Sequence, residues 1–223
     1  MERLKKLLYP NGVGKKEYRN MVGQDHLIES AKIPVPKIKE CCKKVLEDPS
    51  FDINSIPYNE LVEYQICYFI IGLSRIKDFV LQLDFIYKNA YIAKSWMTTD
   101  LCNQYLIKPN ITEYKNYFLK LIKLNGTYER RFAYVIALKM AKDINASKFF
   151  LDNIIDDDRY YVLMAEAWLI AEIGIYHFDL VKTFLEMKGH LVELKRKAIS
   201  KMIDSYRISD ENKLLLKEIR KKL

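Results

Sequence analysis

Apolar residues recur at intervals of three or four positions from about Pro34 to the C-terminus. This spacing gathers apolar side chains on one face of a helix, so it predicts a succession of amphipathic or buried helices. The predicted helices are Pro34–Asp48, Tyr58–Leu73, Arg75–Lys88, Tyr91–Ile107, Thr112–Leu124, Thr127–Ala141, a short helix from Asn145 or Ser147 to Ile155, Tyr160–Ile175, Tyr176–Met187, His190–Asp204 and Ser209–Lys221. No alternating segment of useful strand length is present, and the pattern predicts an all-α fold.

The predicted helices form pairs at a regular interval. The first helix of each pair begins near residue 59, 91, 128, 159 and 190, so the step is about 31–37 residues, within or just below the range of HEAT-like repeats. Because each pair buries its faces against its neighbours, we expect a superhelical solenoid of antiparallel pairs in 34–223, within a single domain 1–223. Residues 1–33 are expected to hold one or two short helices. An irregular all-α domain is the alternative.

Composition agrees with a globular helical protein. Half of the 223 residues are hydrophobic, which excludes a disordered chain, and seven glycines with six prolines argue against a loop-rich β scaffold. The 37 Lys+Arg exceed the 29 Asp+Glu and give a formal charge of +8. This charge permits a polyanionic partner such as nucleic acid, or an anionic membrane surface, but does not distinguish them.

Several function classes find no support in the sequence. The four cysteines and three histidines show no metal-ligand spacing, and the few glycines form no phosphate-binding or dinucleotide-binding motif, so no metal and no cofactor are expected. We interpret Asp156–Asp158 as a helix-capping cluster and not as a calcium site. The longest apolar run, Tyr64–Leu73, is too short to cross a bilayer, and no secretory segment is visible. A cytoplasmic protein that is not a membrane protein is expected.

Both tryptophans of the chain lie in predicted helices, together with two charged residues at corresponding places in successive repeats. Trp96 and Asp100 are four residues apart and share a helix face. Arg131 opens the first helix of the next pair, and Trp168 lies midway along the first helix of the pair after that. Equivalent helices of a solenoid line the same side, so we expect all four side chains on one concave surface. The alternatives are core tryptophans, an ordinary surface Asp100, and an Arg131 that pairs with Asp100 or Glu129.

The segments that carry these residues are KSWMTTD, ERRFAYVIALK, YYVLMAEAWLIAE and KAISKMIDSYRIS. In order and spacing this set resembles the DNA alkylation repair family of HEAT-like-repeat (AlkD-like) DNA glycosylases, from about Ile33 to the C-terminus. The resemblance implies release of cationic N3- or N7-alkylated purines from duplex DNA without a deep base-flipping pocket. By the same resemblance, Asp100 is the catalytic carboxylate, Trp96 and Trp168 pack against the DNA backbone at the lesion, and Arg131 holds a phosphate. The part before Pro34 is shorter than in the best-known members, which indicates a shortened subfamily.

Basic residues flank the predicted groove and are candidates for phosphate contacts. They are Lys37, Lys39, Lys43 and Lys44 near the first long helix, Lys94 before Trp96, Arg130, and the run Lys195, Arg196, Lys197 and Lys201. A solvated helix face that serves solubility is the alternative for each lysine.

Three functions follow, in order of preference. The first is a monofunctional DNA glycosylase of the base excision repair type, a monomer that acts on double-stranded DNA and associates with the nucleoid when bound. The second is a non-catalytic DNA-binding member of the same family that recognises lesions or DNA shape. The third is a helical-repeat scaffold for protein partners.

Overall fold

The computed structural model describes residues 2–10, 12, 16–18, 28–30 and 32–223. Twelve α-helices and one two-stranded sheet lie in these ranges, so the all-α prediction is confirmed. The chain divides into two compact units, residues 1–108 and 109–223. Each unit is described below by itself, and the single domain 1–223 stays a prediction.

Unit 1 contains five α-helices within its described residues. They are α1 (Glu2–Leu8), α2 (Val35–Leu46), α3 (Val62–Arg75), α4 (Phe79–Asn89) and α5 (Trp96–Cys102), with short 3-10 segments at Ile53–Ser55, Ala90–Ile92 and Asn103–Tyr105. Strands β1 (Lys16–Tyr18) and β2 (Ile28–Ser30) pair antiparallel, with Lys16 opposite Ser30. Helix α1 agrees with the expectation of a short helix before residue 34. The strands were not predicted, because three residues are too few for an alternating pattern to be visible.

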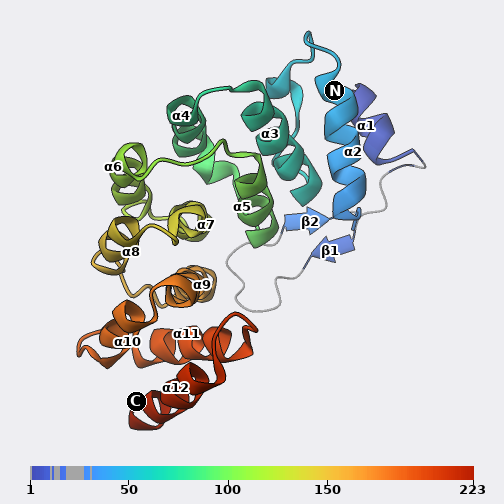
Figure 1. The fold of residues 1–223 in the computed structure, drawn as a ribbon. Coiled ribbons are helices and arrows are strands. Elements are labelled where there is room, and N and C mark those ends of the chain that lie inside the picture. Colours follow the sequence, from blue (N-terminus) through green and yellow to red (C-terminus); the bar gives the residue numbers. More distant parts are fainter. Residues whose placement is uncertain (1, 11, 13–15, 19–27, 31) are drawn as a thin grey trace. The chain divides into compact units, whose positions relative to one another are not determined.

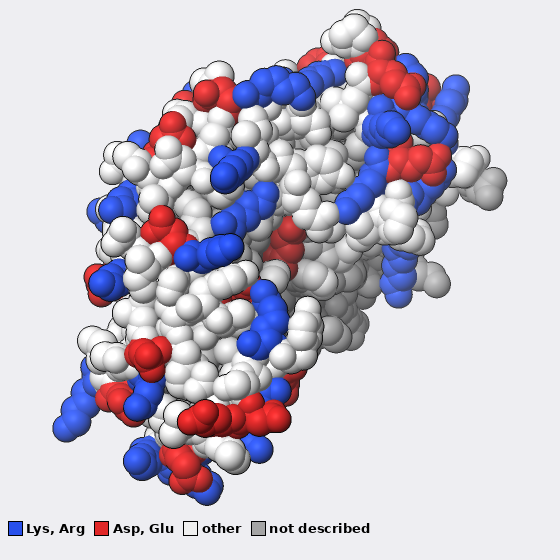
Figure 2. Space-filling model, viewed as in Figure 1, with Lys and Arg blue, Asp and Glu red and all other residues white. Residues whose placement is uncertain are grey.

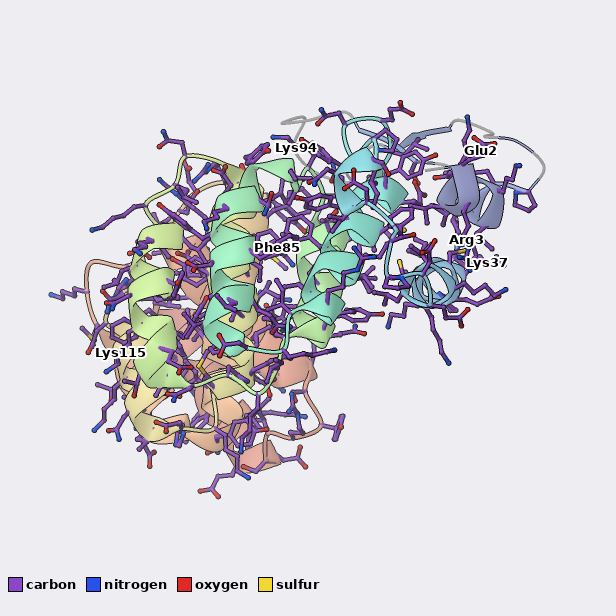
Figure 3. The ribbon with its side chains drawn as sticks, turned by 90° about the horizontal axis from the view of Figure 1, so that it is seen from above. Glu2, Arg3, Lys37, Phe85, Lys94 and Lys115 are labelled. Carbon is purple, nitrogen blue, oxygen red and sulfur yellow. The ribbon has the colours of Figure 1, made fainter. Side chains whose placement is uncertain are left out.

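Helix α3 is the centre of unit 1. Its residues Val62–Leu73 are all buried, and α2, α4 and α5 pack against it. Gly72 permits the close approach of α4, because a Cβ atom added there would lie 2.3 Å from Cζ of Phe85. Figure 3 shows Phe85 on α4. The absence of a side chain at Gly72 therefore determines how closely these two helices pack.

The predicted helix Tyr91–Ile107 is wrong in its extent. The chain instead forms the 3-10 turn Ala90–Ile92, becomes extended at Ser95 (φ −148°, ψ 144°), and begins α5 only at Trp96. The physical reason is that a side chain replaces a backbone carbonyl as the acceptor at this point. The amide of Lys94 donates to Gln65 Oε1 at 3.0 Å, and Ser95 caps the helix that begins at Trp96. Trp96 is consequently the first residue of a seven-residue helix.

Unit 2 contains seven α-helices. They are α6 (Ile111–Leu121), α7 (Thr127–Ala137), α8 (Ile144–Leu151), α9 (Tyr160–Tyr176), α10 (Phe178–Glu186), α11 (Val192–Asp204) and α12 (Asp210–Lys222), with a 3-10 turn at Leu138–Met140. Helices α7, α9 and α11 pack successively in one row, and α6, α8, α10 and α12 form a second row (Figure 1). Two such rows are the packing of a helical-repeat array. The cap of α8 is Asp143, and not Asn145 or Ser147 as predicted.

The repeat step predicted from the sequence agrees with the observed starts of the first helices. Helices α3, α5, α7, α9 and α11 begin at residues 62, 96, 127, 160 and 192, which gives steps of 34, 31, 33 and 32 residues. Within the described residues, no helix has the length and apolar character that a membrane crossing requires. Figure 2 shows basic side chains interspersed with acidic ones over the visible face.

Candidate functional site

Trp96 and Asp100 share one face of α5 in unit 1. Thr98, Thr99 and Cys102 of the same helix are buried, whereas Trp96 and Asp100 are both half-buried. The hydroxyl of Ser95 accepts the amide of Met97 at 3.2 Å, which satisfies one of the free donors at the start of the helix. The short helix therefore presents an indole and a carboxylate together.

Gln65 of α3 fixes the start of α5. Its Oε1 accepts hydrogen bonds from the amide of Lys94 at 3.0 Å and from the hydroxyl of Thr98 at 3.3 Å. The side chain is fully buried, and its Nε2 has no hydrogen-bond partner among the described residues. One acceptor thus holds both the residue before the Ser95 cap and the first turn of the helix.

The carboxylate of Asp100 has a hydroxyl beside it. The Thr99 hydroxyl lies 3.0 Å from Asp100 Oδ1 and 2.9 Å from the carbonyl oxygen of Trp96. A hydroxyl at this distance restricts the rotation of the short Asp100 side chain. The arrangement can place a negative charge at a defined position next to the Trp96 ring.

Arg131 of unit 2 is buried, with 6 % of its surface exposed. It lies on α7, and its Nη1 donates to the carbonyl oxygen of Tyr161 on α9 at 2.6 Å. A neighbouring helix thereby orients the guanidinium. A contact of Arg131 with a phosphate stays a prediction. It would have to be made by the small part of the side chain that is exposed to solvent.

Trp168 lies midway along α9 and is 37 % exposed. It forms a groove with the next turns of α9 and with the end of α11. The lining residues are Trp168, Ala171, Glu172, Ile175, Lys201, Asp204, Ser205 and Arg207. Arg207 binds Glu172 through both terminal nitrogens, at 2.9 and 2.6 Å, which is the bidentate geometry of a strong ion pair. An exposed indole beside a fixed ion pair is suited to a ligand with both apolar and charged parts.

Arg130, predicted to contact DNA, has a protein partner. Its Nη1 binds Asp157 Oδ2 at 2.7 Å, and its Nε donates to the carbonyl oxygen of Leu124. Arg159 binds the same carboxylate through its amide, Nε and Nη2. These hydrogen bonds hold the pKa of Asp157 below its ordinary value, although burial acts to raise it.

Asp156–Asp158 precede the start of α9, as a helix-capping cluster would, but none of the three is the N-cap residue. Helix α9 follows Arg159, which provides no side-chain cap. Asp156 instead accepts His190 Nδ1 at 2.8 Å and the amide of Leu191 at 3.1 Å, from a backbone with φ 53°. The segment is a polar junction between α7, α9 and α11.

The basic residues predicted in unit 1 differ in their availability. Lys37 pairs with Glu40 at 3.3 Å, whereas Lys43 is exposed, and neither its ammonium group nor that of Lys94 has an ion pair in the described part of the chain. Figure 3 shows Lys37 and Lys94 on separate segments of this unit. Lys43 and Lys94 therefore keep a charge that is open to a ligand.

All four cysteines are buried, and none of them forms a disulfide. Burial raises the pKa of the Cys41 and Cys102 thiols, which keeps them protonated and unreactive. In the described ranges, no group of three or more His, Cys, Asp or Glu side chains is placed to hold a metal ion.

Comparison with known proteins decides the family. The family model described as DNA alkylation repair enzyme matches residues 27–212, well over half of the chain. The chain belongs to the DNA alkylation repair enzyme family. Membership supports a role in DNA repair with DNA as the partner. No curated protein and no solved structure gives a significant match.

The four residues that the family resemblance singles out lie two in each unit. Trp96 and Asp100 share a helix in unit 1, and Arg131 and Trp168 lie on adjacent helices of unit 2. Their common DNA-facing surface stays a prediction. The sequence did not reveal the supporting residue Gln65, although a lone amide inside an apolar helix was the available signal.

Proposed function

We propose that this member of the DNA alkylation repair enzyme family is a monofunctional glycosylase for cationic N3- or N7-alkylated purines in duplex DNA. The observation that carries the proposal is the joint placement of Trp96 and Asp100 on the partly exposed face of α5. The family match covers this helix and supports the assignment.

The proposed reaction is hydrolysis of the bond between the base and C1′ of deoxyribose. An alkylated purine already carries a positive charge, so it leaves with the bonding electron pair as a neutral base and needs no general acid. The sugar becomes oxocarbenium-like, and a nearby carboxylate stabilises this charge. Asp100 also orients the water, whose oxygen bonds to C1′ and whose proton is released to solvent.

The tryptophans and the arginine have binding roles in the proposal. The faces of Trp96 and Trp168 contact the deoxyribose and the cationic base, an attraction of about 0.5–2 kcal/mol per contact. The guanidinium of Arg131 contacts a backbone phosphate, for which its planar fork is suited. Lys43 and Lys94 add phosphate contacts that depend on salt.

The test is release of 3-methyladenine or 7-methylguanine from methylated duplex DNA. Wild-type protein is expected to release base, and Asp100→Asn is expected to lose about 10²–10³-fold in rate, because it keeps the shape and removes the charge. Asp152→Asn is the matched control, since Asp152 is an exposed carboxylate at the end of α8. Equal rates for both variants would show that Asp100 does not act in the reaction.

The second candidate is a family member that binds DNA without excision. It differs from the glycosylase in the role of Asp100, whose Oδ1 would then serve only to hold the Thr99 hydroxyl at 3.0 Å. Such a protein binds duplex DNA with salt-dependent affinity and releases no base. A protein-interaction scaffold, the third candidate, shows no salt-dependent duplex affinity at all.

The proposal includes a setting for the protein. We propose a monomer that needs no metal or cofactor, resides in the cytoplasm and associates with the nucleoid. Light scattering at working concentration tests the monomer, and unchanged base release in excess chelator tests the independence from metal.

A further inference from the structure

Three cationic side chains converge between the last two helices of unit 2. Arg196 and Lys197 lie on α11, in the same stripe as Glu193 and Ser200, and Arg220 near the end of α12 lines the same pocket. Together with Val192, these five residues line an open pocket of about 520 Å³, named here the α11–α12 pocket.

The cations of the α11–α12 pocket have no anionic protein partner. In the described part of the chain, none of the Arg196, Lys197 and Arg220 side chains forms an ion pair or a hydrogen bond. Glu193 is the single carboxylate of the lining, so the lining carries a net charge of +2. The neighbouring Lys195 points inward instead, where its Nζ donates to the carbonyl oxygen of Met187.

Other arginines of unit 2 bind carboxylates, which sets Arg196 and Arg220 apart from them. Arg130 and Arg159 share Asp157, and Arg207 binds Glu172 through two nitrogens. Three cations kept close together without such partners repel one another. An anionic ligand would remove this repulsion, and two guanidinium groups with an ammonium group are the donors that favour phosphate.

We propose that the α11–α12 pocket binds a phosphodiester of the DNA backbone outside the lesion. This inference rests on the proposed function, which makes DNA the ligand. The open form of the pocket admits a continuous polymer.

The neighbouring groove gives the direction of that polymer. Lys201 lies one turn after Lys197 on α11 and lines the groove that contains Trp168. Four helical residues rise about 6 Å, close to the rise of two nucleotides at about 3.4 Å each. A strand that follows α11 therefore passes from Trp168 to the α11–α12 pocket within a few nucleotides.

The experiment measures the affinity of full-length protein for an undamaged duplex as a function of salt. The test variant combines Arg196→Gln, Lys197→Gln and Arg220→Gln. It is expected to bind about tenfold or more weakly at low salt and to lower the log–log salt slope by at least about one, the contribution of one phosphate contact. A further variant with Arg196→Lys and Arg220→Lys should recover most of the slope, because it keeps the charges.

The matched control removes three charges from the same unit outside the pocket, as Lys188→Gln, Lys213→Gln and Lys217→Gln. It is expected to leave the slope within about 0.3 of wild type, because these side chains line no part of the pocket. Circular dichroism and thermal melts confirm that both triple variants fold. Equal loss of slope in the two triple variants would overturn the proposal, because net charge alone would then explain it.

Two further arms separate the alternatives. In the first, inorganic phosphate raises the melting temperature of the wild type but not of the pocket variant, while the salt slope of duplex binding is the same for both. That result would indicate a site for free phosphate and would overturn the proposal. If the wild type releases base and the pocket variant binds duplex DNA as the wild type does, this inference is wrong and the proposed glycosylase activity stands. If the wild type releases no base and the pocket variant still lowers the salt slope, the result supports the proposed pocket and contradicts only the glycosylase activity.

Discussion

Gln65 is a buried polar residue whose hydrogen bonds act on another helix. Its single oxygen holds the Lys94 amide and the Thr98 hydroxyl, so it determines where α5 begins and therefore where the Trp96 ring lies. A buried donor left without an acceptor costs about 1–3 kcal/mol, which is enough to shift a seven-residue helix. The residue acts through α5 and has no contact with substrate in the proposed reaction.

Gln65→Met is expected to move Trp96, because it removes the acceptor and keeps a side chain of similar size. In a Trp168→Phe background, Trp96 is the single tryptophan, and its emission maximum should shift toward the red as the helix start loosens. Tyr68→Phe is the matched control on α3, since it removes a hydrogen bond of 2.9 Å to Asn89 on the side of α4. A similar emission shift in both variants would refute the specific role of Gln65.

Glu166 is a buried carboxyl in the most apolar helix of the chain. Burial raises its pKa to about 8, although the neighbouring Tyr134 and the Ile155 amide act to lower it. The folded state then keeps the proton between pH 5 and 8, while the unfolded state releases it. The free energy of unfolding accordingly falls as pH rises through this window, by up to about 1.4 kcal/mol per pH unit from this group.

Glu166→Gln is expected to abolish that part of the pH dependence, because an amide of the same shape cannot ionise. Urea denaturation of wild type and variant at pH 5, 7 and 9 measures the difference. The variant should gain stability relative to wild type as pH rises, and the exposed control Glu186→Gln should not. Parallel curves for Glu166→Gln and wild type would contradict the raised pKa.

At the scale of elements, the hydrophobic pattern predicted most helices but misplaced the start of α5, which carries the proposed site residues Trp96 and Asp100. The period of apolar residues determines which segments are helical, so α2, α6 and α9 agree with it to within a few residues. Helix α5 differs because its start depends on Gln65, which lies about thirty positions away in the sequence. The spacing of apolar residues carries no information about contacts between residues distant in the sequence. For the same reason it did not predict that Asp157 is the partner of Arg130.

The packing of α3 on α4 provides a test at this scale. Gly72→Ala is expected to destabilise unit 1 by about 1–3 kcal/mol, because the added Cβ would lie 2.3 Å from the ring of Phe85. Phe85→Leu should recover part of that loss in the double variant, since a smaller side chain leaves room for the methyl group. Thermal unfolding of the two single variants and the double variant measures the coupling. Additive losses would indicate that the two positions do not meet.

At the scale of the whole molecule, the proposed function joins residues from both units. Residues Trp96 and Asp100 come from the first unit, and Arg131 and Trp168 come from the second. A repeat step of about 31–34 residues accounts for this division, because each segment with a proposed site residue lies in the first helix of its own repeat. The family match extends across the boundary between the units, from residue 27 to 212, which supports a function that needs both.

Duplex DNA is therefore expected to reach both tryptophans in one binding event. The variants Trp96→Phe and Trp168→Phe each leave one indole, and each emission should change on titration with a duplex that carries an abasic site. The two titrations should give the same midpoint, because one ligand causes both changes, and raising the salt should move both midpoints together. A response from Trp168 alone would confine binding to unit 2 and would remove Asp100 from the reaction, whereas a response from both is what catalysis on α5 requires.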